Sequence, residues 1–124
     1  MRRYTRVPFL RRARVHLESQ DVEVCCLDLS LRGILLTQPE HHLDLGSDQT
    51  FEVTLVVSDA ERVRFYCREV HSDWDVFGCS IEYIGLRDIA LLTRILQLNL
   101  PDWCCPAEEW NHRVNENGPF SRCD

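Results

Sequence analysis

The chain has 124 residues, a formal net charge of −6 and seven cysteines. This length suits one domain with its own hydrophobic core, and no stretch approaches the ~20 apolar residues that a membrane-spanning helix needs. No apolar run of signal-peptide length follows Met1, so we expect a soluble, cytoplasmic protein whose cysteines are free thiols.

All fourteen basic residues are arginines, and they are unevenly distributed. Six of them lie within residues 1–14, before any acidic residue, so residues 15–124 carry a net charge of −12. We therefore expect a flexible, Arg-rich, ligand-binding arm over residues 1–14, attached to an acidic body. Such a body repels a polyanion such as nucleic acid at long range, whereas the arm alone can hold a compact dianion. A basic leader without a specific ligand is the alternative.

Alternation of apolar and polar residues predicts a series of short β-strands. Residues 28–33 interrupt the alternation and predict a turn, with Gly33 free to adopt a backbone conformation that other residues resist. Near-regular spacing favours an antiparallel barrel over alternating strand and helix units. The expected strands are residues 14–18, 22–27, 34–37, 50–58, 62–70 and 76–84.

The periodicity becomes helical over residues 86–99. Asp88 lies in the favourable first turn and Pro101 follows the segment, which supports a helix with these bounds. We expect this helix to cover an open end of the barrel, and we expect the tail, residues 101–124, to be partly helical or disordered. The apolar stripe of the helix consists of Leu86, Ile89, Ala90, Leu92, Ile95 and Leu96.

Two short motifs occur in order along the chain. Arg2 and Arg6 are separated by three residues (RxxxR), and about twenty residues later Asp28, Ser30 and Gly33 form the pattern DxSxxG. The pair, in this order, resembles the signature of PilZ domains, which bind the bacterial second messenger cyclic di-GMP. The resemblance covers about residues 2–100, and it implies a mainly β fold: a six-stranded antiparallel PilZ-type barrel with a C-terminal helix.

The residue types suit a guanine nucleotide on chemical grounds. A guanidinium can donate to guanine O6 and N7 at once, and the same fork can neutralise a phosphate. By resemblance, Arg2 and Arg6 are the motif arginines that clamp guanine edges and phosphates, and Arg3 adds a contact.

The DxSxxG residues have both a binding and a structural interpretation. The Asp28 carboxylate matches guanine N1–H and the 2-amino group, while the Ser30 hydroxyl can bond a base edge or a phosphate. Gly33 serves the turn rather than the chemistry. An ordinary capped turn formed by Asp28 and Ser30 is the structural alternative. The candidate ligand-binding residues are therefore Arg2, Arg3, Arg6, Asp28, Ser30 and Gly33.

These patterns predict a cyclic di-GMP receptor or adaptor that orders its arm on binding and signals to an unidentified effector protein. The resemblance implies outputs such as biofilm formation, motility or pili. The adjacent Arg2 and Arg3 suggest that a stacked dimer of the dinucleotide could be bound. We expect no enzymatic activity, no cofactor, no membrane insertion and no nucleic-acid binding. The main alternative is a PilZ-fold interaction module that does not bind nucleotide.

Three further groups of residues have side chains of types that bind ligands or metals. His71 and Trp74 lie where many PilZ domains carry a side chain that stacks on guanine, and the sequence does not decide between them. Arg32, inside the second motif, could approach a phosphate or be solvated. No metal site is expected, because the spacing of the available ligands matches no zinc pattern. Those ligands are His41, His42, Cys104, Cys105, His112 and Cys123.

Overall fold

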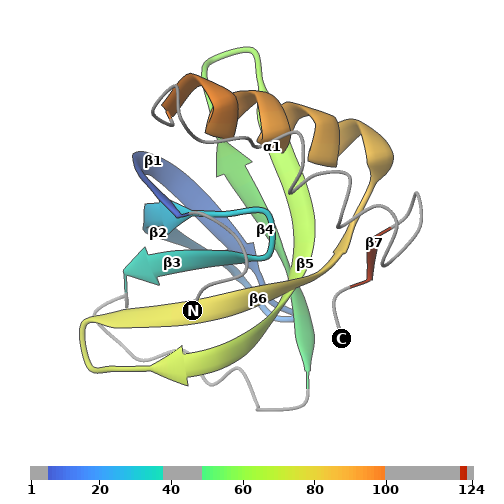
Figure 1. Ribbon diagram of the computed structural model, residues 1–124. Helices are drawn as coiled ribbons and strands as arrows, with labels where there is room; N and C mark the ends of the chain where they lie inside the picture. Colours follow the sequence, from blue (N-terminus) through green and yellow to red (C-terminus); the bar gives the residue numbers. More distant parts are fainter. Residues whose placement is uncertain (1–5, 38–48, 100–120, 123–124) are drawn as a thin grey trace.

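The computed structural model describes residues 6–37, 49–99 and 121–122. The chain forms antiparallel strands that curl into a barrel, with one helix after the sixth strand (Figure 1). The barrel strands are β1 (Val7–His16), β2 (Asp21–Leu29), β3 (Gly33–Thr37), β4 (Thr50–Val56), β5 (Arg62–Ser72) and β6 (Val76–Ile84).

The six strands close on themselves in the order β3-β2-β1-β4-β5-β6, because β3 also pairs with β6. The predicted six-stranded antiparallel barrel is thereby confirmed. Alternate side chains point inward, as the period-two pattern required: Val53 and Leu55 of β4, like Val63 and Phe65 of β5, are almost fully buried. The apolar interior fixes which face of each strand meets solvent, and so fixes where the polar residues gather.

Strand β1 begins at Val7, seven residues earlier than the first predicted strand. Residues 7–14, which we expected to belong to the arm, therefore lie in the barrel. Val7 and Phe9 point inward near the start of the strand, but the register with β2 shifts between Pro8 and Arg11. This bulge breaks the alternation, and arginines occupy the outward positions, so the segment does not look like a strand in the sequence.

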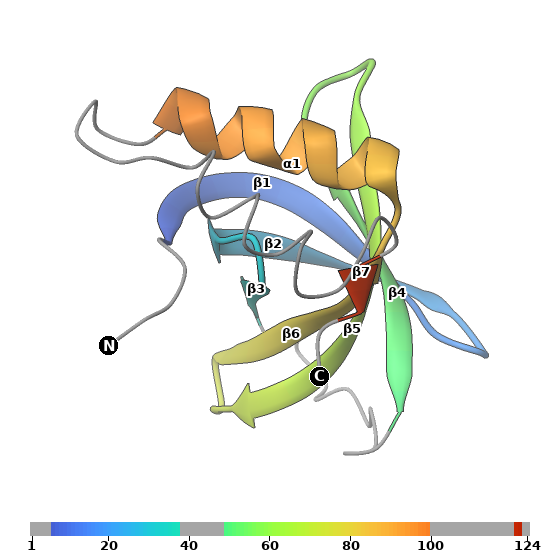
Figure 2. The same ribbon diagram turned by 45° about the vertical axis from the view of Figure 1, so that its right-hand side comes forward.

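Helix α1 (Leu86–Asn99) has the predicted bounds and lies across one end of the barrel, against β5 and β1 (Figure 2). Its buried residues are Ile89, Leu92, Ile95 and Leu96. Two members of the expected stripe, Leu86 and Ala90, are exposed instead. The expected covering role is confirmed. Within the described part of the chain, no helix is both long and apolar enough to cross a membrane.

Most of the predicted tail, and the loop of residues 38–48, lie outside the described residues. Ser121 and Arg122 form a short strand, β7, which pairs with β6 at Ile84 and Tyr83. We expected a partly helical or disordered tail rather than a strand here, because nothing in the local pattern indicates a strand. Pairing with the exposed edge of β6 supplies hydrogen bonds that the segment could not form by itself.

The described cysteines are free thiols in contrasting environments. Cys25 is exposed, whereas Cys26, Cys67 and Cys79 are buried. Burial, reinforced by the negative charge of Asp28 and by Cys25, raises the pKa of Cys26 to about 12. Cys25 and Cys26 differ sharply in exposure because adjacent side chains of a strand point to opposite faces.

The raised pKa of Cys26 predicts that the fold loses stability at alkaline pH. Because Cys26 stays protonated in the fold while an unfolded thiol ionises near pH 9, folding stability should fall from about pH 9 toward pH 12, by up to about 1.4 kcal/mol per pH unit. Urea unfolding at pH 8 and pH 10.5 measures this effect. The Cys26→Ala variant is the control, and its pH dependence should be shallower. Equal slopes in both proteins would contradict the assignment.

Candidate functional site

The DxSxxG residues lie around the turn between β2 and β3, with Asp28 near the end of β2, Ser30 in the turn and Gly33 at the start of β3. Leu29 and Leu31, on either side of Ser30, are fully buried and fix this segment to the core. The backbone N–H of Ser30 donates to the carbonyl oxygen of Gly33 at 2.9 Å. The Ser30 Oγ accepts from the backbone N–H groups of Gly33 at 3.1 Å and Arg32 at 3.2 Å. Ser30 is itself buried, so its hydroxyl is committed to the turn in this structure.

We therefore expect Ser30→Ala to destabilise the fold by about 1–3 kcal/mol, because it leaves buried N–H groups without an acceptor. Urea unfolding measures the change. The control is Ser58→Ala, since the Ser58 Oγ accepts from two backbone N–H groups in the same way, from Ala60 and Glu61, but in an exposed turn. Water can replace that acceptor, so the control should lose clearly less. Equal losses would show that burial of the Ser30 turn contributes nothing.

Gly33 is required for close approach to β6. A Cβ added at this position would lie 3.1 Å from the carbonyl oxygen of Cys79, 3.7 Å from Arg6 Nη2 and 3.9 Å from Ser30 Oγ. The φ angle of Gly33 is outside the left-handed range, so the expected special backbone conformation is not the reason for glycine here. The reason is the tight pairing of β3 with β6. Its absent side chain also leaves room beside the Arg6 guanidinium.

Arg6 reaches the second motif directly. Its Nη1 donates to Asp28 Oδ1 at 2.8 Å, and both side chains are partly exposed, at 33% and 27%. The structure thus brings together Arg6, Asp28, Ser30 and Gly33, four of the six predicted site residues. Arg2 and Arg3 lie outside the described residues. An exposed guanidinium held beside a carboxylate presents donors and acceptors side by side, which is the pattern that a guanine edge complements.

Strand register extends this group across the outer face of the barrel. Asp28 pairs with Leu35, Leu35 with Gly78, and Gly78 with His71, so these four residues form one row across β2, β3, β6 and β5. The row spans three strand spacings, about 14 Å. Leu35 and Gly78, which have no polar side-chain group, lie between Asp28 and His71 in this row.

A second row runs beside the first. Gly33 pairs with Ser80, and Ser80 pairs with Arg68. Arg68 is exposed, and its Nε lies 3.4 Å from Oε1 of the buried Glu82. Sequence reasoning missed both Ser80 and Arg68, because no motif marks them. The only signal that could have found them is the pairing of β3 with β6, which joins segments more than forty residues apart.

Most of the sequence matches the family model for the PilZ domain, over residues 1–98. This chain belongs to the PilZ domain family. The PilZ barrel also resembles the solved structure of the Bacillus subtilis inhibitor of motility (MotI/DgrA), with a TM-score of 0.62 and 14% sequence identity. The match covers 78% of this chain and 50% of that one, so the chain spans half the length of that protein, and the likeness concerns the fold alone. No curated protein sequence matches significantly.

The register separates the two aromatic candidates of this PilZ domain. His71 stands in the same row as Asp28, and its Cβ lies 3.7 Å from a Cβ built at Gly78. Trp74 lies in the turn between β5 and β6 and is 83% exposed. His71 is therefore the better placed of the two. The His71 Nε2 lies 3.0 Å from Asp73 Oδ2, which restrains the ring.

The remaining sequence candidates add little to the PilZ site. The backbone carbonyl of Arg32 accepts from Ile81 N–H at 2.8 Å and so helps to join the turn to β6. Among the described residues, no group of three or more His, Cys, Asp or Glu side chains is arranged to hold a metal ion. The metal ligands considered from sequence, such as His41 and Cys104, lie outside the described residues.

Proposed function

We propose that this PilZ domain is a cyclic di-GMP receptor that signals to a partner protein. The observation that carries the proposal is the ion pair between Arg6 and Asp28, which joins the two motifs at 2.8 Å beside Gly33. Both side chains are accessible, and their chemistry complements a guanine edge. Family membership supports the same ligand.

The two rows of residues suggest how the ligand lies. One guanine meets Arg6 and Asp28, the other extends over Leu35 and Gly78 toward His71, and the phosphates meet arginines. Arg2 and Arg3 supply phosphate contacts from the arm, and Arg68 is a further cation within reach. In this proposal Ser30 and Gly33 act by shaping the turn that presents Asp28, because the Ser30 hydroxyl is already bonded within it.

Signalling then follows from the arm. A dinucleotide that bridges the arm and the barrel stabilises one arrangement of residues 1–5. A partner that recognises this arrangement binds more tightly in the presence of the nucleotide. Motility is one candidate output, since the similar solved structure is that of an inhibitor of motility.

Calorimetric titration with cyclic di-GMP, beside cyclic di-AMP, tests the receptor proposal. We expect micromolar or tighter binding that is selective for guanine, with two nucleotides per chain if a stacked dimer is bound. Saturation at one nucleotide per chain would exclude the stacked dimer. No heat at high ligand concentration would contradict the receptor function and leave the alternative, a PilZ-fold interaction module that works through protein contacts.

A further inference from the structure

A second charged surface lies away from the candidate nucleotide site. Two exposed arginines of β1 and two of β5 point outward on either side of β4, and α1 adds two more at the side. Arg14 pairs with Thr54 and Thr54 pairs with Arg64, so these two arginines are two strand spacings apart, about 10 Å. We call the group the arginine surface: Arg12, Arg14, Arg62, Arg64, Arg87 and Arg94.

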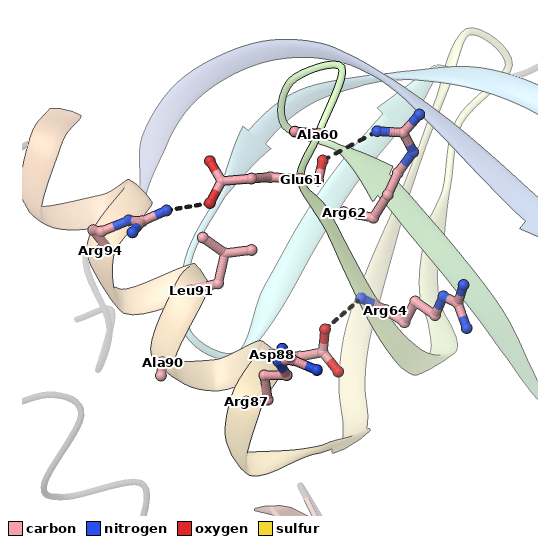
Figure 3. A pocket seen from close by; sticks show the side chains of 9 residues that line it. All are labelled: Ala60, Glu61, Arg62, Arg64, Arg87, Asp88, Ala90, Leu91 and Arg94. Atoms are coloured by element: carbon pink, nitrogen blue, oxygen red, sulfur yellow. Dashed lines mark hydrogen bonds and ion pairs between the residues drawn. The ribbon is translucent and has the colours of Figure 1, made fainter.

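Two clefts shape this surface. One, of about 320 Å³, lies over β1, β4 and β5 and is lined by Arg12, Arg14, Arg62 and Arg64. The other, of about 740 Å³, lies between β5 and α1 and is lined by Arg62 and Arg64 of the strand and by Arg87 and Arg94 of the helix. The Arg62 and Arg64 guanidinium groups extend away from the helix (Figure 3). Because Arg62 and Arg64 line both clefts, the two clefts adjoin along β5.

The arginine surface is electropositive on a chain whose net charge is −6. Among the residues that the structure describes, three carboxylates line the two clefts, those of Glu23, Glu61 and Asp88. Glu23 pairs with Arg14 at 2.9 Å, and Glu61 pairs with Arg94 (Figure 3). Asp88 accepts a hydrogen bond from the backbone N–H of Arg64 at 3.2 Å.

Four guanidinium groups of the arginine surface are left without a carboxylate partner within the described part of the chain. They are those of Arg12, Arg62, Arg64 and Arg87. Several like charges held close together in a concave region repel one another, and an anionic occupant removes that repulsion.

The chemistry of the surface favours one kind of occupant. Guanidinium forks bind carboxylates in a bidentate manner, and Val56, Ala60, Ala90 and Leu91 supply small apolar contacts between them. Among the described residues no Phe, Tyr or Trp side chain lines either cleft, so bases have only the His16 imidazole to stack on. An acidic protein segment with small aliphatic side chains satisfies both features.

We propose that the arginine surface is the docking site for an acidic segment of the partner protein. The proposal rests on the proposed function only for its signalling role. Strand β1 links the two sites: it follows Arg6 directly and carries Arg12 six residues on, about 20 Å along the strand. A ligand that orders the start of β1 therefore acts on the strand that carries part of the docking surface.

Fluorescence anisotropy at low salt with a labelled 12-residue peptide of repeating Glu-Ala-Glu-Leu units tests this assignment. The full chain should bind it saturably, and Arg64→Glu and Arg12→Glu should each weaken binding about tenfold. The matched control is Arg11→Glu, an exposed β1 arginine that lines neither cleft, and it should change binding less than twofold. Thermal melting verifies that each variant is folded.

Several results would overturn the docking site. These are no saturable binding, an equal loss in Arg11→Glu, or equal binding of the corresponding Lys-Ala-Lys-Leu peptide. Tighter binding of a 12-nucleotide single strand or of phosphatidylserine vesicles than of the peptide would also overturn it.

Cyclic di-GMP titration of the same variants separates the two proposals. Unchanged nucleotide affinity with lost peptide binding supports two distinct sites. Loss of nucleotide binding in Arg64→Glu would place the arginine surface in the nucleotide site and overturn the docking proposal. Absence of nucleotide binding in the unmodified chain would remove the receptor function, while the peptide result would still decide the docking surface.

Discussion

The Arg6→Ala variant should lose most of its affinity for cyclic di-GMP while remaining almost as stable as the unmodified chain. A bidentate contact between arginine and guanine contributes about 1–3 kcal/mol, which corresponds to about 5- to 150-fold in the dissociation constant. The ion pair of Arg6 with Asp28 is partly exposed, so its loss should lower the free energy of unfolding by no more than about 1 kcal/mol. Calorimetry and urea unfolding measure the two quantities.

The control is Arg11→Ala, because Arg11 is an exposed arginine of β1 whose guanidinium bonds backbone oxygens of Leu10 and Val57. Its removal should leave nucleotide affinity within twofold. A double-mutant cycle with Asp28→Ala sharpens the test, since residues that act on the same guanine edge should not have additive effects. Full affinity in Arg6→Ala would contradict the assignment of the nucleotide site.

The elements that follow a strict period could be predicted from the sequence. The bounds of β6 and α1 agree with the expected ones, because apolar residues recur at the strand or helix period over most of each segment. The start of β1 could not be predicted, since the bulge between Pro8 and Arg11 shifts the alternation where arginines already mask it. The pairing of Val7 with Leu29 of β2 defines where β1 begins, and the local sequence pattern does not contain this information.

The candidate site was predictable only as far as its motifs extend. The motifs indicated Arg6 and Asp28 as candidate ligand-binding residues, but not the ion pair that joins them. The burial of the Ser30 hydroxyl and the rows that lead to His71 and Arg68 depend on closure between β3 and β6. Such long-range register is set by the packed barrel, and no local spacing encodes it.

The second large effect concerns the helix that closes the barrel. Leu92 is fully buried between α1 and the strands, so Leu92→Ala should destabilise the fold by about 2–5 kcal/mol through lost burial and the cavity left behind. Leu98, on the same helix, is 78% exposed, and Leu98→Ala should change stability by less than about 0.5 kcal/mol. Both substitutions remove the same atoms and have the same helix propensity change, so urea unfolding isolates the packing of α1 on the barrel.

The same pair of variants tests the structural basis of the docking surface. One wall of the cleft between β5 and α1 is the helix itself, which carries Arg87 and Arg94. If Leu92 holds this wall in place, Leu92→Ala should weaken peptide binding even under conditions where the barrel stays folded, whereas Leu98→Ala should not. Equal stability of the two variants would show that α1 is not anchored through Leu92, and the cleft would then lose the rigid wall on which the docking site depends.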